Sequence, residues 1–282
     1  MRDAHDGGLA EPAPARLVPS RALPRAAGPV FDLALERGSD GLTRIARRRV
    51  AWPWSLPRGF RLGDPVGGPN GCLSLIPQAA GAALMPGDAW EQRLTLGPGA
   101  CARLITAGST SVHGPGQAET VWRLSIGPGA WLALLPDPSV LFDGASLVQT
   151  IEVELAEGAV LALADGICLR AADTRPAGVA TRLSVQGPKG RILEERQIAG
   201  PESFVRLAGM PGRPAAFGAL TLIGAHPAEA GPLDLPGAYA AAGSLRNGAG
   251  ITARIAAADG GALTRALHSV TAKWLPGFER RP

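Results

Sequence analysis

The sequence is poor in cysteine and in long apolar runs. It has only three cysteines in 282 residues, and Cys72, Cys101 and Cys168 lie far apart. This pattern is typical of neither a disulfide framework nor a CxxC metal site, so each is interpreted as a small buried apolar residue in a reducing compartment. The first residues lack a signal-peptide run, and no stretch approaches the roughly 18 apolar residues of a membrane-spanning helix. These absences predict a cytoplasmic protein that does not enter the membrane.

Motifs for nucleotide binding and catalysis are also missing. Neither lysine follows a Walker-type glycine loop, no GxGxxG opens a helix after a strand, and there is no GxSxG elbow. The four histidines are far apart and share no short motif with a cysteine, so neither a preformed metal site nor a Ser-His-Asp set is expected. His113 is interpreted as a surface or hydrogen-bonded residue rather than a metal ligand. We therefore expect a protein that is not an enzyme and has no intrinsic cofactor.

Glycine and proline are abundant, with 38 and 26 residues, whereas aromatic residues make up only 5%. This composition favours many short strands separated by turns over long helices. Arginine is concentrated near the start of the chain, but the run Arg47–Arg49 lacks interleaved aromatic residues. We interpret that run as a solvated or partner-facing edge and expect no nucleic-acid partner.

An internal repeat is the most informative feature of the sequence. Its copies are Leu94–Leu104, Leu124–Leu134 and Val153–Leu163, with a looser fourth copy at Leu183–Leu193. The turn glycines Gly99, Gly129 and Gly158 are 30 and 29 residues apart, and Gly190 follows 32 residues later. A constant period of this length indicates similar units that stack their faces into one continuous core.

Each copy is predicted to be a strand, a tight turn and a second strand. Leu124 and Ile126 alternate with Arg123 and Ser125, which is the pattern of a half-buried strand. The Gly-Pro-Gly insert combines the fixed φ of proline with a glycine that can adopt a positive φ. The sequence therefore predicts an all-β fold with minor α content, built from stacked β-helix-like repeats.

Segments outside the repeat give three further predictions. The spacing of Leu263, Leu267, Val270 and Trp274 predicts a C-terminal amphipathic helix. A short alanine-rich helix is expected around Tyr239 to Leu245. Residues 1–28, rich in Ala, Pro and Arg, are predicted to be a disordered tail, and residues 29–282 a single β domain.

Four aspartates lie beside turn residues: Asp88, Asp137, Asp143 and Asp165. Aspartate next to glycine or proline commonly closes a turn through the neighbouring backbone, and this structural interpretation is favoured for each of them. The alternative is that some line a cation path or a partner interface. Carboxylate oxygens along such a path would bind a divalent ion weakly and let it move on, whereas a cage of His or Cys would retain it.

The segment Leu134–Leu147, which follows a Gly-Pro-Gly-Ala turn, resembles part of the urease accessory protein D family (UreD, also called UreH). In that family a Pro-x-Pro precedes an Ile/Val-Leu-Phe and a small turn, as in Pro136-Asp-Pro and Val140-Leu-Phe here. Further segments similar to the family are Pro86–Asp88, Thr106–His113 and Asp165–Leu169. The resemblance extends from about Leu42 to Gly200.

The chain departs from the family pattern at several positions. Ala82 and Ala83 stand where the family usually has a glycine pair, and Ser111 and His113 where it has Lys and Tyr. The Gly-Arg and Gly-Glu pair expected after Leu169 is reduced to Arg170–Arg175. These differences concern the roles of single residues rather than the fold.

The resemblance implies a scaffold that joins UreF and the GTPase UreG, docks on apo-urease and passes nickel toward its active site. Nickel would be a transient passenger, with Asp88 and Asp143 as the leading candidates for weak ligands. A carbohydrate-active β-helix enzyme remains an alternative, but it needs two acids at matched positions, and the repeat turns offer only Glu157. A structural, adhesin-like solenoid is a third interpretation, and it conflicts with the missing secretion signal.

Overall fold

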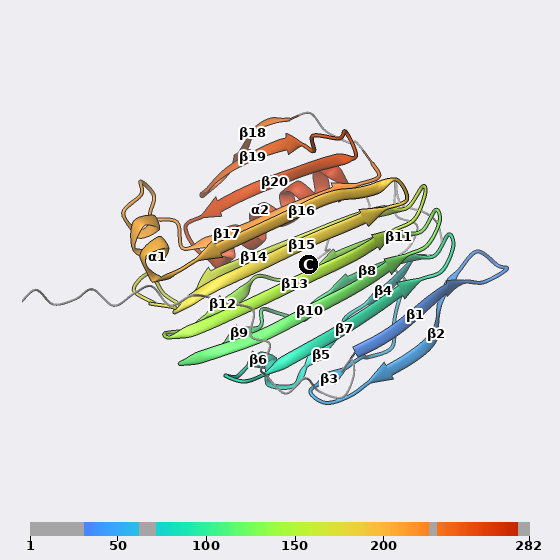
Figure 1. Cartoon of the computed structure of the whole chain (residues 1–282), viewed down its shortest axis with the longest axis horizontal. Helices are drawn as coiled ribbons and strands as arrows, with labels where there is room; N and C mark the ends of the chain where they lie inside the picture. Colours follow the sequence, from blue (N-terminus) through green and yellow to red (C-terminus); the bar gives the residue numbers. More distant parts are fainter. Residues whose placement is uncertain (1–30, 62–71, 226–229, 276–282) are drawn as a thin grey trace, which may run out of the picture.

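The computed structural model describes residues 31–61, 72–225 and 230–275, and consists mainly of two facing β-sheets (Figure 1). The seven-stranded sheet contains, in spatial order, β16 (Gly190–Ala199), β15 (Gly178–Gly187), β13 (Ala145–Leu155), β10 (Gly116–Ile126), β7 (Ala89–Leu96), β1 (Phe31–Arg37) and β2 (Thr43–Val50). The predicted disordered tail, residues 1–28, lies outside the described residues.

The second sheet has eleven strands. Its main path is β18 (Gly231–Leu235), β19 (Ala238–Ser244), β20 (Gly250–Ala257), β17 (Ala216–Ile223), β14 (Val160–Leu169), β11 (Trp131–Leu135), β8 (Cys101–Ile105) and β4 (Leu73–Leu75). Three short strands extend it beside β14: β12 (Ser139–Leu141), β9 (Ser111–Val112) and β6 (Ala83–Leu84). A separate pair is formed by β3 (Trp54–Ser55) and β5 (Gln78–Ala79), which precedes a 3-10 turn at Ala80–Ala82.

The repeat forms a β-solenoid, as predicted. Each copy runs along one strand of the seven-stranded sheet, turns at its glycine and returns in the other sheet, so that neighbouring copies pair in parallel. The register places Leu94, Leu124, Val153 and Val185 in one column, and all four side chains are buried between the sheets. Each such side chain stabilises the fold by roughly 1.5–3 kcal/mol. The all-β prediction with stacked repeats is thus confirmed.

The fourth copy ends the solenoid instead of extending it. Residues 127–130 connect β10 to β11 across the two sheets, whereas only Pro188 and Lys189 separate β15 from β16. A connection of this length makes a hairpin, and β16 accordingly returns antiparallel to β15 within the same sheet. The chain then passes through α1 (Pro201–Ala208), a helix that the sequence patterns did not indicate, and enters the other sheet as β17.

The C-terminal helix is present as α2 (Gly260–Trp274), and the Asp259 side chain caps it by accepting the Ala262 N–H at 2.7 Å. Its predicted apolar stripe is buried against the outer face of the eleven-stranded sheet. The second predicted helix, around Tyr239 to Leu245, is wrong, because this segment is β19. Its residues alternate in exposure and pair with strands on both sides, so sheet pairing overrides the helix preference of alanine.

The interpretation of the cysteines is wrong for two of the three. Cys72 and Cys101 form a disulfide with a Cα–Cα distance of 4.5 Å. They are 29 residues apart, which is one solenoid turn, and Leu73 pairs in register with Ala102 beside them. The repeat period was therefore the signal for this pair, and a reducing compartment no longer follows from the cysteine count. Cys168 is a buried free thiol whose pKa is raised to about 11 by burial.

Substitution of Gly99 or Gly129 tests the solenoid turns, where φ is 63° and 61°. A Cβ atom added at Gly129 would meet nothing within 4 Å, so the main cost of a branched residue there is backbone strain. We expect Gly99→Val and Gly129→Val each to lower the free energy of unfolding by roughly 1–3 kcal/mol in urea titrations.

The matched control is Gly108→Val, because Gly108 also has open space around it but does not adopt the left-handed conformation. Equal unfolding midpoints for all three variants would show that the turns carry no such strain.

Candidate functional site

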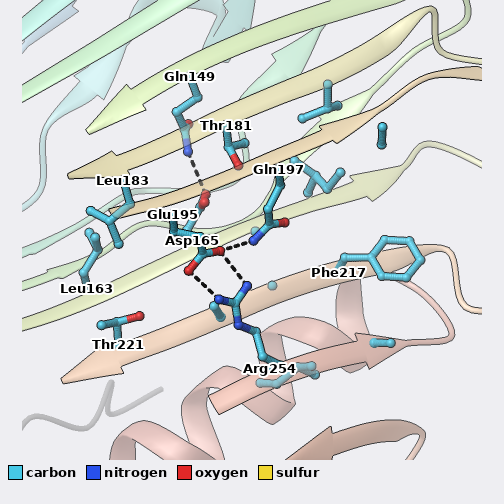
Figure 2. Close-up of a pocket in the computed structure, with 18 of the residues that line it drawn as sticks. Gln149, Leu163, Asp165, Thr181, Leu183, Glu195, Gln197, Phe217, Thr221 and Arg254 are labelled. Carbon is cyan, nitrogen blue, oxygen red and sulfur yellow. Dashed lines mark hydrogen bonds and ion pairs between the residues drawn. The ribbon is translucent and has the colours of Figure 1, made fainter. Parts of the chain in front are cut away.

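A cavity of about 660 Å³ lies where the two sheets separate beyond the solenoid (Figure 2). β13, β15 and β16 line one side, β14, β17, β19 and β20 line the other, and α1 adds the side chains of Phe204 and Leu207. The β15–β16 hairpin creates this space, because β16 stays in the seven-stranded sheet while the opposite sheet continues through β17 and β20. Most of the wall is apolar, for example Ile151, Leu163 and Phe217. A few polar groups in such a wall are typical of a binding site.

The first polar contact across the cavity joins Gln149 and Asp165. The Gln149 amide, on β13, donates a hydrogen bond of 2.7 Å to the Asp165 carboxyl on β14 in the opposite sheet. Burial raises the pKa of Asp165 above its usual value, and the nearby charge of Glu195 acts in the same direction, while the bond from Gln149 opposes it. The Asp165 carboxyl therefore retains a proton more readily than an exposed aspartate.

The second polar contact is an ion pair between Glu195 on β16 and Arg254 on β20. Nη1 of Arg254 lies 2.6 Å from Oε1 of Glu195, and its Nη2 bonds the other carboxylate oxygen. Gln197 also donates to Glu195. Figure 2 shows these side chains converging between the strands of the two sheets. A bidentate guanidinium–carboxylate pair fixes both groups in orientation as well as in distance.

The charge on the cavity wall is nearly balanced. In the part of the chain that the structure describes, the charged residues lining the cavity are Asp165, Arg182, Glu195 and Arg254. Arg182 is bound to Glu194 at 2.9 Å, so it is already neutralised. Two carboxyl groups thus face one available guanidinium.

Exposed apolar side chains lie on the cavity wall and on the neighbouring helix α1. Ile198 and Tyr239 line the cavity and are 71% and 61% exposed, and Val205 and Met210 lie in α1 and just after it with 59% and 47% exposure. We call these four residues the apolar rim. Trp52 and Met85 are the other large exposed apolar side chains among the described residues, and they lie in different connections. A concentration of this kind is typical of a protein-docking surface.

Of the four aspartates singled out in the sequence, Asp165 alone lines the cavity, and its interpretation as a turn former is wrong, because it lies within strand β14. Asp88 accepts the Met85 N–H at 2.7 Å and so closes its own turn, whereas Asp143 accepts the N–H of Arg175, 32 residues away, at 2.7 Å and ties two connections together. These two precede β7 and β13, the neighbours of β10, at one end of the seven-stranded sheet.

Asp137, the remaining aspartate, is held by Thr106, whose hydroxyl lies 2.8 Å from its backbone nitrogen and 3.2 Å from its carboxylate. The ring of His113 stacks on Phe142 at 4.4 Å, in keeping with a structural role. No group of three or more His, Cys, Asp or Glu side chains is placed to hold a metal ion in residues 31–61, 72–225 and 230–275.

Sequence patterns missed Gln149, Glu195 and Arg254. Gln149 had a detectable signal, because it interrupts the inward-facing apolar series of Leu147, Ile151 and Val153 in the third repeat. The charged residues of β16 and β20 had none, since alternation alone does not show that these two strands face each other.

Comparison with known proteins gives a consistent result. The family model described as UreD urease accessory protein matches residues 28–282. UreD 1 of Bradyrhizobium sp. (strain BTAi1) is 33% identical over 242 residues, which cover 82% of this chain and 85% of the relative. UreD 1 of Methylorubrum extorquens (strain PA1) is 31% identical over 278 residues, covering 94% and 92%.

A shorter match, to UreD 2 of the same Bradyrhizobium strain, has 36% identity over 149 residues and spans 51% of this chain and 50% of the relative. No helix in the described residues has the length and apolar character needed to cross a membrane. The family match over residues 28–282, supported by relatives aligned along most of the chain, shows that this protein belongs to the UreD urease accessory protein family.

Proposed function

We propose that this chain is a non-catalytic scaffold that helps to load nickel into apo-urease. The observation that carries the proposal is the family match over residues 28–282. In this role the protein works in the cytoplasm, joins UreF, acts with the GTPase UreG through that complex, and docks on the urease subunits. Energy for the process comes from the GTPase.

The apolar rim is the proposed docking surface for UreF. Ile198 and Tyr239 line the cavity, and α1 contributes the exposed Val205 beside the buried Phe204. Burying exposed apolar area of this kind stabilises a complex by roughly 25 cal/mol per Å² before the cost of association. A scaffold with this surface uncovered will tend to self-associate.

Nickel is the proposed passenger, and its path runs between the two sheets. Asp165 and Glu195 place hard oxygen ligands inside the cavity, while Asp88 and Asp143 place further carboxylates at one end of the seven-stranded sheet. Oxygen ligands of this type bind nickel weakly compared with imidazole or thiolate. The path therefore favours transit of the ion over storage.

Deletion of this chain tests the function as a whole. In cells that lack it, we expect urease subunits to accumulate at normal levels but to remain largely without metal, and added nickel to restore activity only in part. Metal analysis of purified urease together with urease assays measures both effects. Normal urease activity in the deletion strain would contradict the proposal.

Asparagine substitutions test whether Asp88 and Asp143 act as nickel ligands or only as hydrogen-bond acceptors for the neighbouring backbone. Asn keeps a carbonyl oxygen for the Met85 or Arg175 N–H but removes the charge. We expect Asp88→Asn and Asp143→Asn to lower urease activation severalfold while UreF binding stays intact, measured by urease assay and pull-down. Asp173→Asn, at an exposed turn, serves as the control. Full activation by both variants would leave these aspartates as hydrogen-bond acceptors alone.

Glutamate substitutions on the rim test the docking surface. We expect the lone protein to be poorly soluble and UreF to rescue it, and we expect Ile198→Glu or Val205→Glu to abolish pull-down of UreF. Trp52→Glu and Met85→Glu, which change exposed apolar residues elsewhere, should leave binding intact. A lone protein that is monodisperse and ignores UreF would remove this partner from the proposal.

A further inference from the structure

The Gln149–Asp165 and Glu195–Arg254 contacts both cross the cavity, and the second lies at its mouth. It ties β16, the last strand of the seven-stranded sheet, to β20 in the opposite sheet. Of the rim residues, Ile198 lies in β16 itself and Tyr239 lies in β19, the neighbour of β20. The pair therefore closes the cavity at the place where the apolar rim is exposed.

The two partners of this pair differ in how well they can be reached from outside. The Arg254 side chain is 47% exposed, whereas the Glu195 side chain is 21% exposed. A protein that covers the rim therefore meets the guanidinium before the carboxylate. Arginine binds a carboxylate bidentately, and the interaction strengthens when apolar groups exclude water around it.

We propose that the Glu195–Arg254 pair is a latch, opened when a docking protein segment with one carboxylate among apolar side chains takes Arg254 away from Glu195. This inference rests on the proposed function, since the segment docks on the same rim. Its carboxylate complements the exposed guanidinium of Arg254, and its apolar side chains cover Ile198 and Tyr239.

Opening the latch changes the charge inside the cavity. With Arg254 withdrawn, the carboxyl groups of Glu195 and Asp165 face each other from opposite sheets, and Gln149 and Gln197 still donate to them. Loss of the ion pair removes a tie between β16 and β20, and the interior, with one cation fewer on its wall, becomes attractive to a cation. Docking of the partner thereby admits the ion to the path.

A latch and a purely structural ion pair predict different effects of two substitutions on partner affinity. If the pair only held the two strands together, loss of either residue would weaken the structure equally. In a latch, Glu195 competes with the incoming carboxylate, so Glu195→Gln frees Arg254 for the partner, whereas Arg254→Gln removes the group that the partner binds. The two variants should therefore shift partner affinity in opposite directions.

Affinity for UreF, measured by titration of the full-length chain, provides the first test. We expect Glu195→Gln to bind UreF about fivefold more tightly than wild type and Arg254→Gln about tenfold more weakly. Asp32→Asn and Arg47→Gln break an ion pair of 2.8 Å within the seven-stranded sheet and should change neither value. Parallel losses for Glu195→Gln and Arg254→Gln, or no change in either, would overturn the docking half of the proposal.

Carbodiimide labelling of Asp165 in the chain alone provides the second test. We expect Arg254→Gln to increase labelling of Asp165 several-fold, and the exchanged variant Glu195→Arg with Arg254→Glu to restore the wild-type level. Circular dichroism confirms that each variant is folded. Unchanged labelling in a folded Arg254→Gln variant would overturn the latch.

The two tests also separate this inference from the proposed function. If UreF does not bind the wild-type chain, the docking half fails together with the UreF assignment, while the labelling result still decides whether the pair closes the cavity. If the UreF titration and the Asp165 labelling both give the expected results but urease is activated normally in the deletion strain, the latch is supported and the proposed role in urease maturation is wrong.

Discussion

In-register stacking of a repeat of about 30 residues is the constraint on which the rest of this structure depends. Leu94, Leu124 and Val153 occupy equivalent positions of successive copies, and parallel pairing places them directly above one another between the sheets. A register shift of one residue would turn each of these side chains out of the core and bring charged neighbours such as Arg123 inward. Because that cost recurs in every copy, the sheets have one stable alignment. The disulfide between Cys72 and Cys101 follows from the same alignment.

The cavity exists because this stacking stops. The two-residue connection at Pro188 and Lys189 keeps β16 in the seven-stranded sheet, so no fourth return strand fills the space opposite β15. The eleven-stranded sheet continues instead through antiparallel strands that are covered on their outer face by α2. Short connections thus decide where the continuous core ends and where polar side chains can project between the sheets. The same short connection between β15 and β16 ends the repeat and leaves the space in which the site lies.

The parts of the fold that the sequence predicts are those fixed by local periodicity. The solenoid follows from the copies around Gly99, Gly129 and Gly158, and α2 follows from its apolar stripe and the cap at Asp259. β19 was mistaken for a helix because its form depends on the strands on either side. Of the site, Asp165 was singled out as part of a turn, but it lies within β14, and its contacts across the cavity could not be predicted. Glu195 and Arg254 are 59 positions apart, and only the three-dimensional arrangement brings them together.

The chemistry of the cavity also suits a carrier better than a catalyst. A glycosidase needs one carboxyl to donate a proton and another left free to act as base or nucleophile. Here Glu195 is held by Arg254 and Asp165 by Gln149, so neither carboxyl is free in the closed form. The same contacts balance the charge, and a cation entering the closed cavity would have to displace a guanidinium or a proton. Under the proposed function, the closed state therefore adds to the weak binding expected of oxygen ligands, and a partner that removes Arg254 would raise the affinity for the ion at the moment of transfer.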